Sequence, residues 1–368
     1  MRNSARATVI DSAVHGNGSQ GAVARDSTQL TVETSTVQGN GDHGISITDA
    51  ARAVLTGNLV AGNPGCGIYS VSSEDVTGEG NRMSANGVDL AGNLGAELRK
   101  PLVPETQARS LSFPGPYTSL QATVDALAPG GVLTLASGEH KGGVTVWKPL
   151  TLKGVASSTV IEGTVSLVDE AQGVGLQGLM IRGSTISGLV LGGHAQATIR
   201  TSAFQENEEH GICVGGRAQA TILDCTASRN GWAGIALEST TQTVVQCSAA
   251  NDNGGDGILL MEHAQAAVGG CELMGNRANG VYIGDSAAGQ LVGNLITANS
   301  GYGVALGGPP CLGKEEAFTG HVSGYANVIP GPDAPDGNKQ GAVCPSELVF
   351  LLLLAPGDEL DARCATCR

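Results

Sequence analysis

Apolar and polar positions recur along this chain with a period of 23 residues. From residue 188 onward, each repeat begins with a glycine followed by a short apolar run such as GLVL, GICV or GIAL. These glycines are Gly188, Gly211, Gly234, Gly257, Gly280 and Gly303. If each glycine is position 0, positions 1, 3 and 11 are apolar. The apolar runs are too short for helices, and their alternation predicts short strands.

Position 19 is asparagine in every repeat, namely Asn207, Asn230, Asn253, Asn276 and Asn299. Position 14 is small or polar: Ser202, Cys225, Ser248, Cys271 and Asn294. A fixed period of this length with glycine-rich corners is typical of a solenoid. We therefore predict an all-β parallel β-helix with one repeat per coil and about 4.8 Å between equivalent residues of successive coils. Both columns then bond from coil to coil at buried corners, so we predict that they are structural rather than catalytic.

The repeat divides the chain into four parts, with two stacked or tandem β-helical segments. Residues 1–95 already carry the repeat, and because they begin inside a coil we interpret them as N-terminally truncated. Residues 96–117 interrupt the period with prolines and charges and are predicted to be a linker. Residues 118–306 form a second β-helix that opens with a short capping helix near 118–128. Residues 307–368 are a loop insertion and a cysteine-containing C-terminal cap.

One stretch, SLQATVDALAPGGVLTLASGEHKGGVTVWKPLTLKG, resembles the opening segment of right-handed parallel β-helix proteins of the pectin-lyase-like superfamily. The resemblance covers about residues 117–306 and extends to 1–95 through the repeats alone. It implies a right-handed helix with a capped end. It implies no particular activity, because the superfamily holds lyases, hydrolases, esterases, epimerases and proteins without known chemistry. The active-site signatures of its pectin methylesterases, polygalacturonases, pectate lyases and epimerases do not occur in this sequence.

Composition narrows the range of partners. The net charge of −14 argues against nucleic acid and acidic lipid surfaces, and it is compatible with bound cations. The apolar run LVFLLLL at 348–354 is too short to span a membrane, and it is predicted to pack on the molecule or to form the last inward strand. No signal peptide precedes the first repeat, so the chain is either cytoplasmic or begins downstream of its natural start.

Charged residues gather at the corner before each glycine. Position 18 is Glu206, Arg229 and Asp252 on successive coils, and the same corner carries Glu208, Glu209, His210, Trp232 and Asp256. One hypothesis is a polysaccharide lyase or epimerase site in which some of the carboxylates Glu206, Glu209, Asp252 and Asp256 hold Ca²⁺. Arg229 or His210 then assists proton transfer, and Trp232 stacks on sugar. We favour the alternative of a solvated corner with surface ion pairs, and we interpret His43 and His210 as surface histidines.

Two outward columns offer lateral surfaces. Position 2 is apolar throughout: Val190, Cys213, Ala236, Leu259, Tyr282 and Ala305. This stripe either docks an elongated partner or glycan, with Tyr282 as a contact, or is covered by the tail or the linker, which we favour. Position 8 is glutamine in four coils, Gln196, Gln219, Gln242 and Gln265. Such a ladder either binds glycan or stabilises the coils, and we favour the structural interpretation.

The non-repeating tail holds Cys311, Cys344, Cys364 and Cys367. In an exported protein such cysteines form disulfides, whereas in a reducing compartment zinc is the better expectation. We predict a non-catalytic, extracytoplasmic β-helix protein, secreted or at the cell surface, that binds polysaccharide or another elongated partner along its side. The alternatives are a lyase or epimerase acting on acidic glycans, and a structural spacer or adhesin. Nothing in the sequence indicates an oligomeric state.

Overall fold

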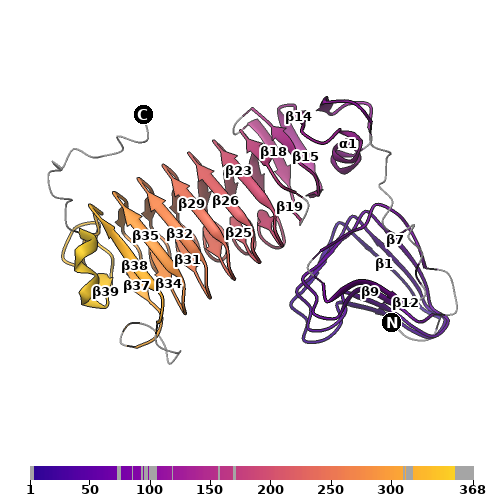
Figure 1. Cartoon of the computed structure of the whole chain (residues 1–368), viewed down its shortest axis with the longest axis horizontal. Coiled ribbons are helices and arrows are strands. Elements are labelled where there is room, and N and C mark those ends of the chain that lie inside the picture. Colours follow the sequence, from indigo (N-terminus) through magenta and orange to yellow (C-terminus); the bar gives the residue numbers. More distant parts are fainter. Residues whose placement is uncertain are drawn as a thin grey trace. The chain divides into compact units, whose positions relative to one another are not determined.

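The computed structural model consists of short parallel strands wound into coils, which confirms the predicted β-solenoid (Figure 1). It describes residues 4–72, 76–84, 86–92, 94, 98, 106–117, 119–155, 158–168, 171–309, 311 and 318–352. Contacts divide the chain into two compact units, Met1–Thr134 with Gly142–Leu150, and Leu135–Lys141 with Thr151–Arg368. Among the described residues, no helix has the length and apolar character needed to cross a membrane.

The coils of the first unit form three parallel sheets. One contains β1 (Arg6–Ile10), β4 (Gln29–Glu33), β7 (Arg52–Thr56) and β10 (Val76–Thr77). The second contains β2 (Ala13–His15), β5 (Thr36–Gln38), β8 (Leu59–Ala61) and β11 (Arg82–Ser84). The third contains β3 (Ala22–Ala24), β6 (Ile45–Ile47), β9 (Cys66–Ser70) and β12 (Val88–Gly92).

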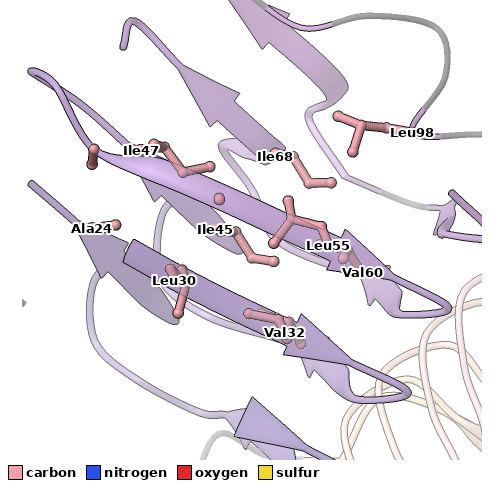
Figure 2. Close-up of a cluster of buried hydrophobic side chains, with 12 residues drawn as sticks. Ala24, Leu30, Val32, Ile45, Ile47, Leu55, Val60, Ile68 and Leu98 are labelled. Atoms are coloured by element: carbon pink, nitrogen blue, oxygen red, sulfur yellow. The ribbon is translucent and has the colours of Figure 1, made fainter. Parts of the chain in front are cut away.

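Aliphatic side chains from all three sheets fill the interior of these coils. Ile45, Leu55 and Ile68 are fully buried in one cluster, and Figure 2 shows them in the space between the strands. The first unit also includes β13 (Ser110–Phe113), α1 (Leu120–Ala126), β14 (Gly131–Leu135) and β16 (Val144–Val146). Helix α1 confirms the helix expected near 118–128. It begins at the N-cap Ser119, whose side chain accepts a hydrogen bond from the Ala122 amide.

The second unit repeats the three-sheet pattern. Sheet I contains β17 (Leu150–Lys153), β20 (Val174–Gln177), β23 (Gln196–Arg200), β26 (Gln219–Leu223), β29 (Gln242–Gln246), β32 (Gln265–Gly269), β35 (Ala288–Val292) and β38 (His321–Tyr325). Sheet II contains β15 (Gly138–Lys141), β18 (Thr159–Glu162), β21 (Met180–Arg182), β24 (Ala203–Gln205), β27 (Thr226–Ser228), β30 (Ala249–Asn251), β33 (Glu272–Met274) and β36 (Leu295–Thr297). Sheet III contains β19 (Val165–Leu167), β22 (Leu189–Leu191), β25 (Ile212–Val214), β28 (Ile235–Leu237), β31 (Ile258–Leu260), β34 (Val281–Ile283), β37 (Tyr302–Leu306) and β39 (Gly341–Cys344).

The register of these strands shows that one 23-residue repeat is one coil. Gln196 pairs with Gln219, Gln219 with Gln242, and Gln242 with Gln265. The asparagines of position 19 form the expected ladder: the Asn230 Nδ2 donates to Asn253 Oδ1 at 3.0 Å, and the Asn253 Nδ2 donates to Asn276 Oδ1 at 3.0 Å. Because these side chains are buried, the ladder satisfies amides that water does not reach.

The C-terminal end is closed by a 3-10 helix, η3 (Ser346–Leu352). It buries Leu348 and Leu351, and the carbonyl of Leu351 accepts two hydrogen bonds from Asn327, from its backbone amide at 3.0 Å and its Nδ2 at 2.9 Å. The start of the LVFLLLL run is therefore a helical cap, and the prediction of a last inward strand is wrong for these residues. Asn327 continues the position 14 column beyond Asn294, and η3 accepts hydrogen bonds from its side-chain and backbone amides at the end of the coils.

Candidate ligand-binding groove

A groove of about 770 Å³ follows the outer face of sheet I across successive coils. Residues from β17, β20, β23, β26, β29, β32, β35 and β38 line it. Strand alternation explains which side chains face outward. In β23, Gln196 is exposed and Thr198 half-buried, whereas Ala197 and Ile199 point into the core. Positions 8 and 10 of each coil therefore form the surface of the groove.

The glutamines at position 8 have no structural partner. Gln196, Gln219, Gln242 and Gln265 are all exposed, and within the described part of the chain their side-chain amides make no hydrogen bond. The asparagines of position 19 differ, because each is buried and bonded on both sides. The favoured interpretation of the glutamine column as a stabilising ladder is therefore wrong. An exposed glutamine is long enough to point away from its neighbours, and the sequence pattern alone does not distinguish the two cases.

The groove is almost free of charge. Among the described residues that line it, His321 at one end is the single titratable side chain. The basic residues Lys153 and Arg200 are the last residues of β17 and β23 and do not line the groove. The side chains that line it are amides, hydroxyls and small apolar groups, which suit a neutral polar ligand.

The charged corner that was the catalytic candidate is an exposed ion pair. The Arg229 Nη2 lies 3.0 Å from Glu206 Oε1 and donates to Gln205 Oε1 at 2.8 Å. Glu206 and Arg229 are about half exposed, and they share a left-handed backbone with Asp252, at φ 57°, 55° and 57°. Asp252 forms no ion pair within the described residues. Of the ion pairs expected along position 18, the one between Glu206 and Arg229 therefore exists and the one between Arg229 and Asp252 does not. The corner points these side chains into solvent, where an ion pair contributes little.

His210 is not a surface residue, contrary to the sequence interpretation. It is 6% exposed, and its Nδ1 accepts a hydrogen bond from the Ala233 amide of the next coil at 3.1 Å. Burial lowers the pKa of His210 from its usual 6.5 to about 4, so the ring is neutral at pH 7. Position 22 thus bonds one coil to the next, and the same geometry recurs where His43 Nδ1 accepts from the Cys66 amide at 2.8 Å.

Asp256 has the same structural role. Its Oδ1 accepts hydrogen bonds from the Asn279 amide at 2.8 Å and from Asn279 Nδ2 at 2.9 Å. Burial raises the pKa of Asp256 above its usual 3.8. Glu208 is exposed and Glu209 half-buried. Within the described residues, no three His, Cys, Asp or Glu side chains come together as a metal site, and the four carboxylates proposed to hold Ca²⁺ are not brought together.

The two aromatic candidates differ in exposure. Trp232 is 56% exposed, and its ring lies edge-on to His210 with 5.3 Å between ring centroids. It belongs to the corner and does not line the groove. Tyr282 is only 9% exposed, so its ring offers little surface to a ligand.

The apolar stripe of position 2 is covered in part, because Val190, Cys213 and Leu259 are only half-buried. Ala236 and Ala305 are fully buried, and the side chain of Tyr282 is mostly buried. Ala305 pairs with Cys344 of β39, and Cys344 forms a disulfide with Cys311 of the insertion, with 5.6 Å between the Cα atoms. A Cβ built on Gly307 would lie 2.8 Å from the Tyr282 hydroxyl. The loop insertion at the start of the tail therefore covers this end of the stripe, in agreement with the favoured interpretation that the tail lies on it. Cys364 and Cys367 lie outside the described residues.

One comparison with known proteins supports the architecture. A family model described as a right handed beta helix region matches residues 1–98 and 165–309. No curated protein matches the chain.

Among solved structures, the periplasmic alginate epimerase AlgG is 14% identical, with a TM-score of 0.38 and coverage of 87% of this chain and 74% of that one. Pectate lyase Pel9A is 11% identical, with a TM-score of 0.45 and coverage of 61% and 79%. The A-module of mannuronan C-5 epimerase AlgE4 from Azotobacter vinelandii is 13% identical, with a TM-score of 0.45 and coverage of 86% and 88%. At these low values, the likenesses carry no argument about chemistry.

Proposed function

Because this chain belongs to the right-handed β-helix family, its stacked coils present long lateral faces, and we propose that it binds a polysaccharide along the groove of sheet I without catalysing a reaction. The observation that carries the proposal is the row of exposed, unpaired glutamine amides at position 8. Each amide offers two donors and an acceptor to a ligand, and sugar hydroxyls match both.

We propose that the groove does not catalyse a reaction because of the side chains that line it. A lyase or epimerase needs a general base within reach of the proton that it removes. Among the described lining residues only His321 can titrate, and it lies at the end of the groove on β38. Glutamine, threonine and alanine side chains bind and position sugars but do not accept a proton at neutral pH.

We place the protein in an extracytoplasmic compartment, either secreted, periplasmic or at the cell surface. The Cys311–Cys344 disulfide supports this location, and Cys247 is also disulfide-bonded. Structural disulfides persist in oxidising compartments and are rare in the cytosol. Polysaccharides are abundant in the same compartments.

Removing two groove amides tests the proposal. In depletion assays on a panel of insoluble polysaccharides, the Gln219→Ala/Gln242→Ala variant should bind about thirtyfold more weakly than the unmodified protein, since each of the two lost hydrogen bonds is worth roughly 1 kcal/mol. The matched control is Gln29→Ala, which removes an exposed glutamine from the same position of a coil in the first unit. Binding that is equal in all three proteins, or absent for every polysaccharide, contradicts the proposal.

The ion pair of Glu206 and Arg229 and the exposed side chain of Trp232 support the alternative of a lyase acting on acidic glycans. Ultraviolet absorbance of unsaturated uronates, measured with Ca²⁺ on alginate, pectate and glycosaminoglycans, tests for it. An activity that Glu206→Ala abolishes would support this corner as the site and overturn the non-catalytic proposal.

A further inference from the structure

Five successive coils of sheet I each place one glutamine in the groove. Four of these occupy position 8, and on β35 the amide moves to position 10, where Gln290 follows Ala288. The strands are paired in strict register from β23 to β35. Equivalent side chains therefore lie about 4.8 Å apart along the coil axis. This spacing is close to the length that one hexose adds to an extended, equatorially linked chain.

A second row runs beside the amides at position 10. It changes from Thr198 and Thr221 to Val244 and Ala267 along the groove. The two rows are two residues apart on each strand, or about 7 Å. A sugar ring lying across them meets an amide at one edge. At the other edge it meets a hydroxyl, or an apolar methyl group suited to its C–H face. Each coil therefore offers one position for one sugar.

The charge of the groove indicates whether its ligand is a neutral or an acidic polysaccharide. A uronate chain brings one negative charge per sugar, a spacing shorter than the Debye length of about 8 Å at physiological ionic strength. A groove that binds such a chain needs a series of cations, and the described lining residues include no lysine or arginine. The net charge of −14 adds long-range repulsion.

Resting on the proposed function, we infer that the ligand is a neutral, extended, equatorially linked hexose chain that lies along the coil axis with one sugar per coil. The amides of Gln196, Gln219, Gln242, Gln265 and Gln290 each contact one sugar. Affinity then depends on chain length up to the length of this row.

Titration calorimetry with β-1,4-linked glucan and mannan oligosaccharides of increasing length tests the inference. Affinity should rise with each added sugar until the chain matches the five glutamines and then level off. It should change little with salt, because neither partner contributes a counter-charge. β-1,4-linked oligomannuronates of equal length, which share the equatorial linkage of mannan and add one carboxylate per sugar, should bind at least about tenfold more weakly. Amylose oligosaccharides, whose axial linkage coils the chain, should also bind weakly.

A charge-swapped variant gives the converse test. Gln219→Lys/Gln242→Lys should weaken binding of the neutral chains and raise affinity for β-1,4-linked oligomannuronates in a salt-dependent manner. The matched control is Gln29→Lys, which should change neither affinity, and equal melting temperatures confirm that the variants are folded.

The outcomes separate the inference from the proposed function. Equal or tighter binding of uronates or amylose by the unmodified protein, or an affinity independent of chain length, overturns the neutral-chain inference and leaves polysaccharide binding intact. No binding of any polysaccharide overturns both.

Discussion

Side-chain amides have two different roles in the second unit. The asparagines of position 19 point inward and bond to the neighbouring coil, so both their donors and acceptors are used inside the protein. The glutamines of position 8 point outward and make no such bond within the described residues. Within one coil, the asparagine amide at position 19 therefore stabilises the fold, whereas the glutamine amide at position 8 serves ligand recognition in our proposal.

Substitution of one ladder asparagine should be strongly destabilising. Asn253 is fully buried, accepts from Asn230 through Oδ1, and donates through Nδ2 to Asn276 and to the Ala227 carbonyl. In Asn253→Leu these partners are left buried and unpaired, at about 1–3 kcal/mol each. We expect a loss of roughly 3 kcal/mol or more in urea unfolding. The control, Gln242→Leu, should change stability by less than about 0.5 kcal/mol. An unchanged midpoint for Asn253→Leu would refute the ladder as a source of stability.

His210 should make the protein less stable as the pH falls. Its folded pKa, about 4, lies below the usual 6.5, so the unfolded chain binds the proton first. The stabilisation is complete above pH 6.5 and is lost as the pH falls toward 4, by about 2–3 kcal/mol. Urea unfolding between these pH values measures it.

The comparison with His210→Gln isolates this effect, because glutamine keeps an acceptor for the Ala233 amide but does not titrate. Burial also raises the pKa of Glu238 and Asp256, and these groups favour the folded state at low pH in both proteins. We therefore expect the variant to lose less stability on acidification than the unmodified protein. Parallel pH profiles would show that His210 is not responsible.

At the scale of elements, the insertion after Gly307 is fixed to the last coil. Cys344 ends β39, which pairs with β37, and its disulfide to Cys311 holds the insertion against the apolar stripe. Sequence position alone does not reveal this contact, because Cys344 reaches the stripe only once β39 has added a coil. Helix α1 was predictable from its amphipathic pattern, whereas the apolar run that forms part of η3 fits a strand equally well.

Removing the Cys311–Cys344 disulfide should destabilise the last coil before the others. The disulfide joins residues 33 apart, and a loop of that size corresponds to about 3–4 kcal/mol of stabilisation. In Cys311→Ser/Cys344→Ser, the amides of β39 should exchange hydrogen faster by a corresponding factor, while those of β26 remain protected, because each coil contacts only its neighbours. Cys66→Ser, which removes a free thiol, is the control. Unchanged hydrogen exchange of the β39 amides would argue against a stabilising role for this disulfide.

At the scale of the whole molecule, the 23-residue period predicts the solenoid, its corners and its ladders, because every coil obeys the same packing constraints. The groove was not predictable in the same way. Gln219 and Asn230 both belong to columns that repeat over successive coils, and only the stacked structure shows that the glutamine amide is unpaired and the asparagine amide fully hydrogen-bonded. His210 was misread because a polar residue beside a glycine corner resembles a surface residue until the next coil covers it.

The strict register of sheet I has a consequence for how the protein can change over generations. An in-frame duplication or deletion of one repeat adds or removes one coil, and the strands on either side still meet in the same alignment. Such a change lengthens or shortens the groove by one glutamine without a new fold having to be found. In our proposal, the number of repeats therefore sets the preferred length of the glycan, and recombination between repeats can change that length in a single step.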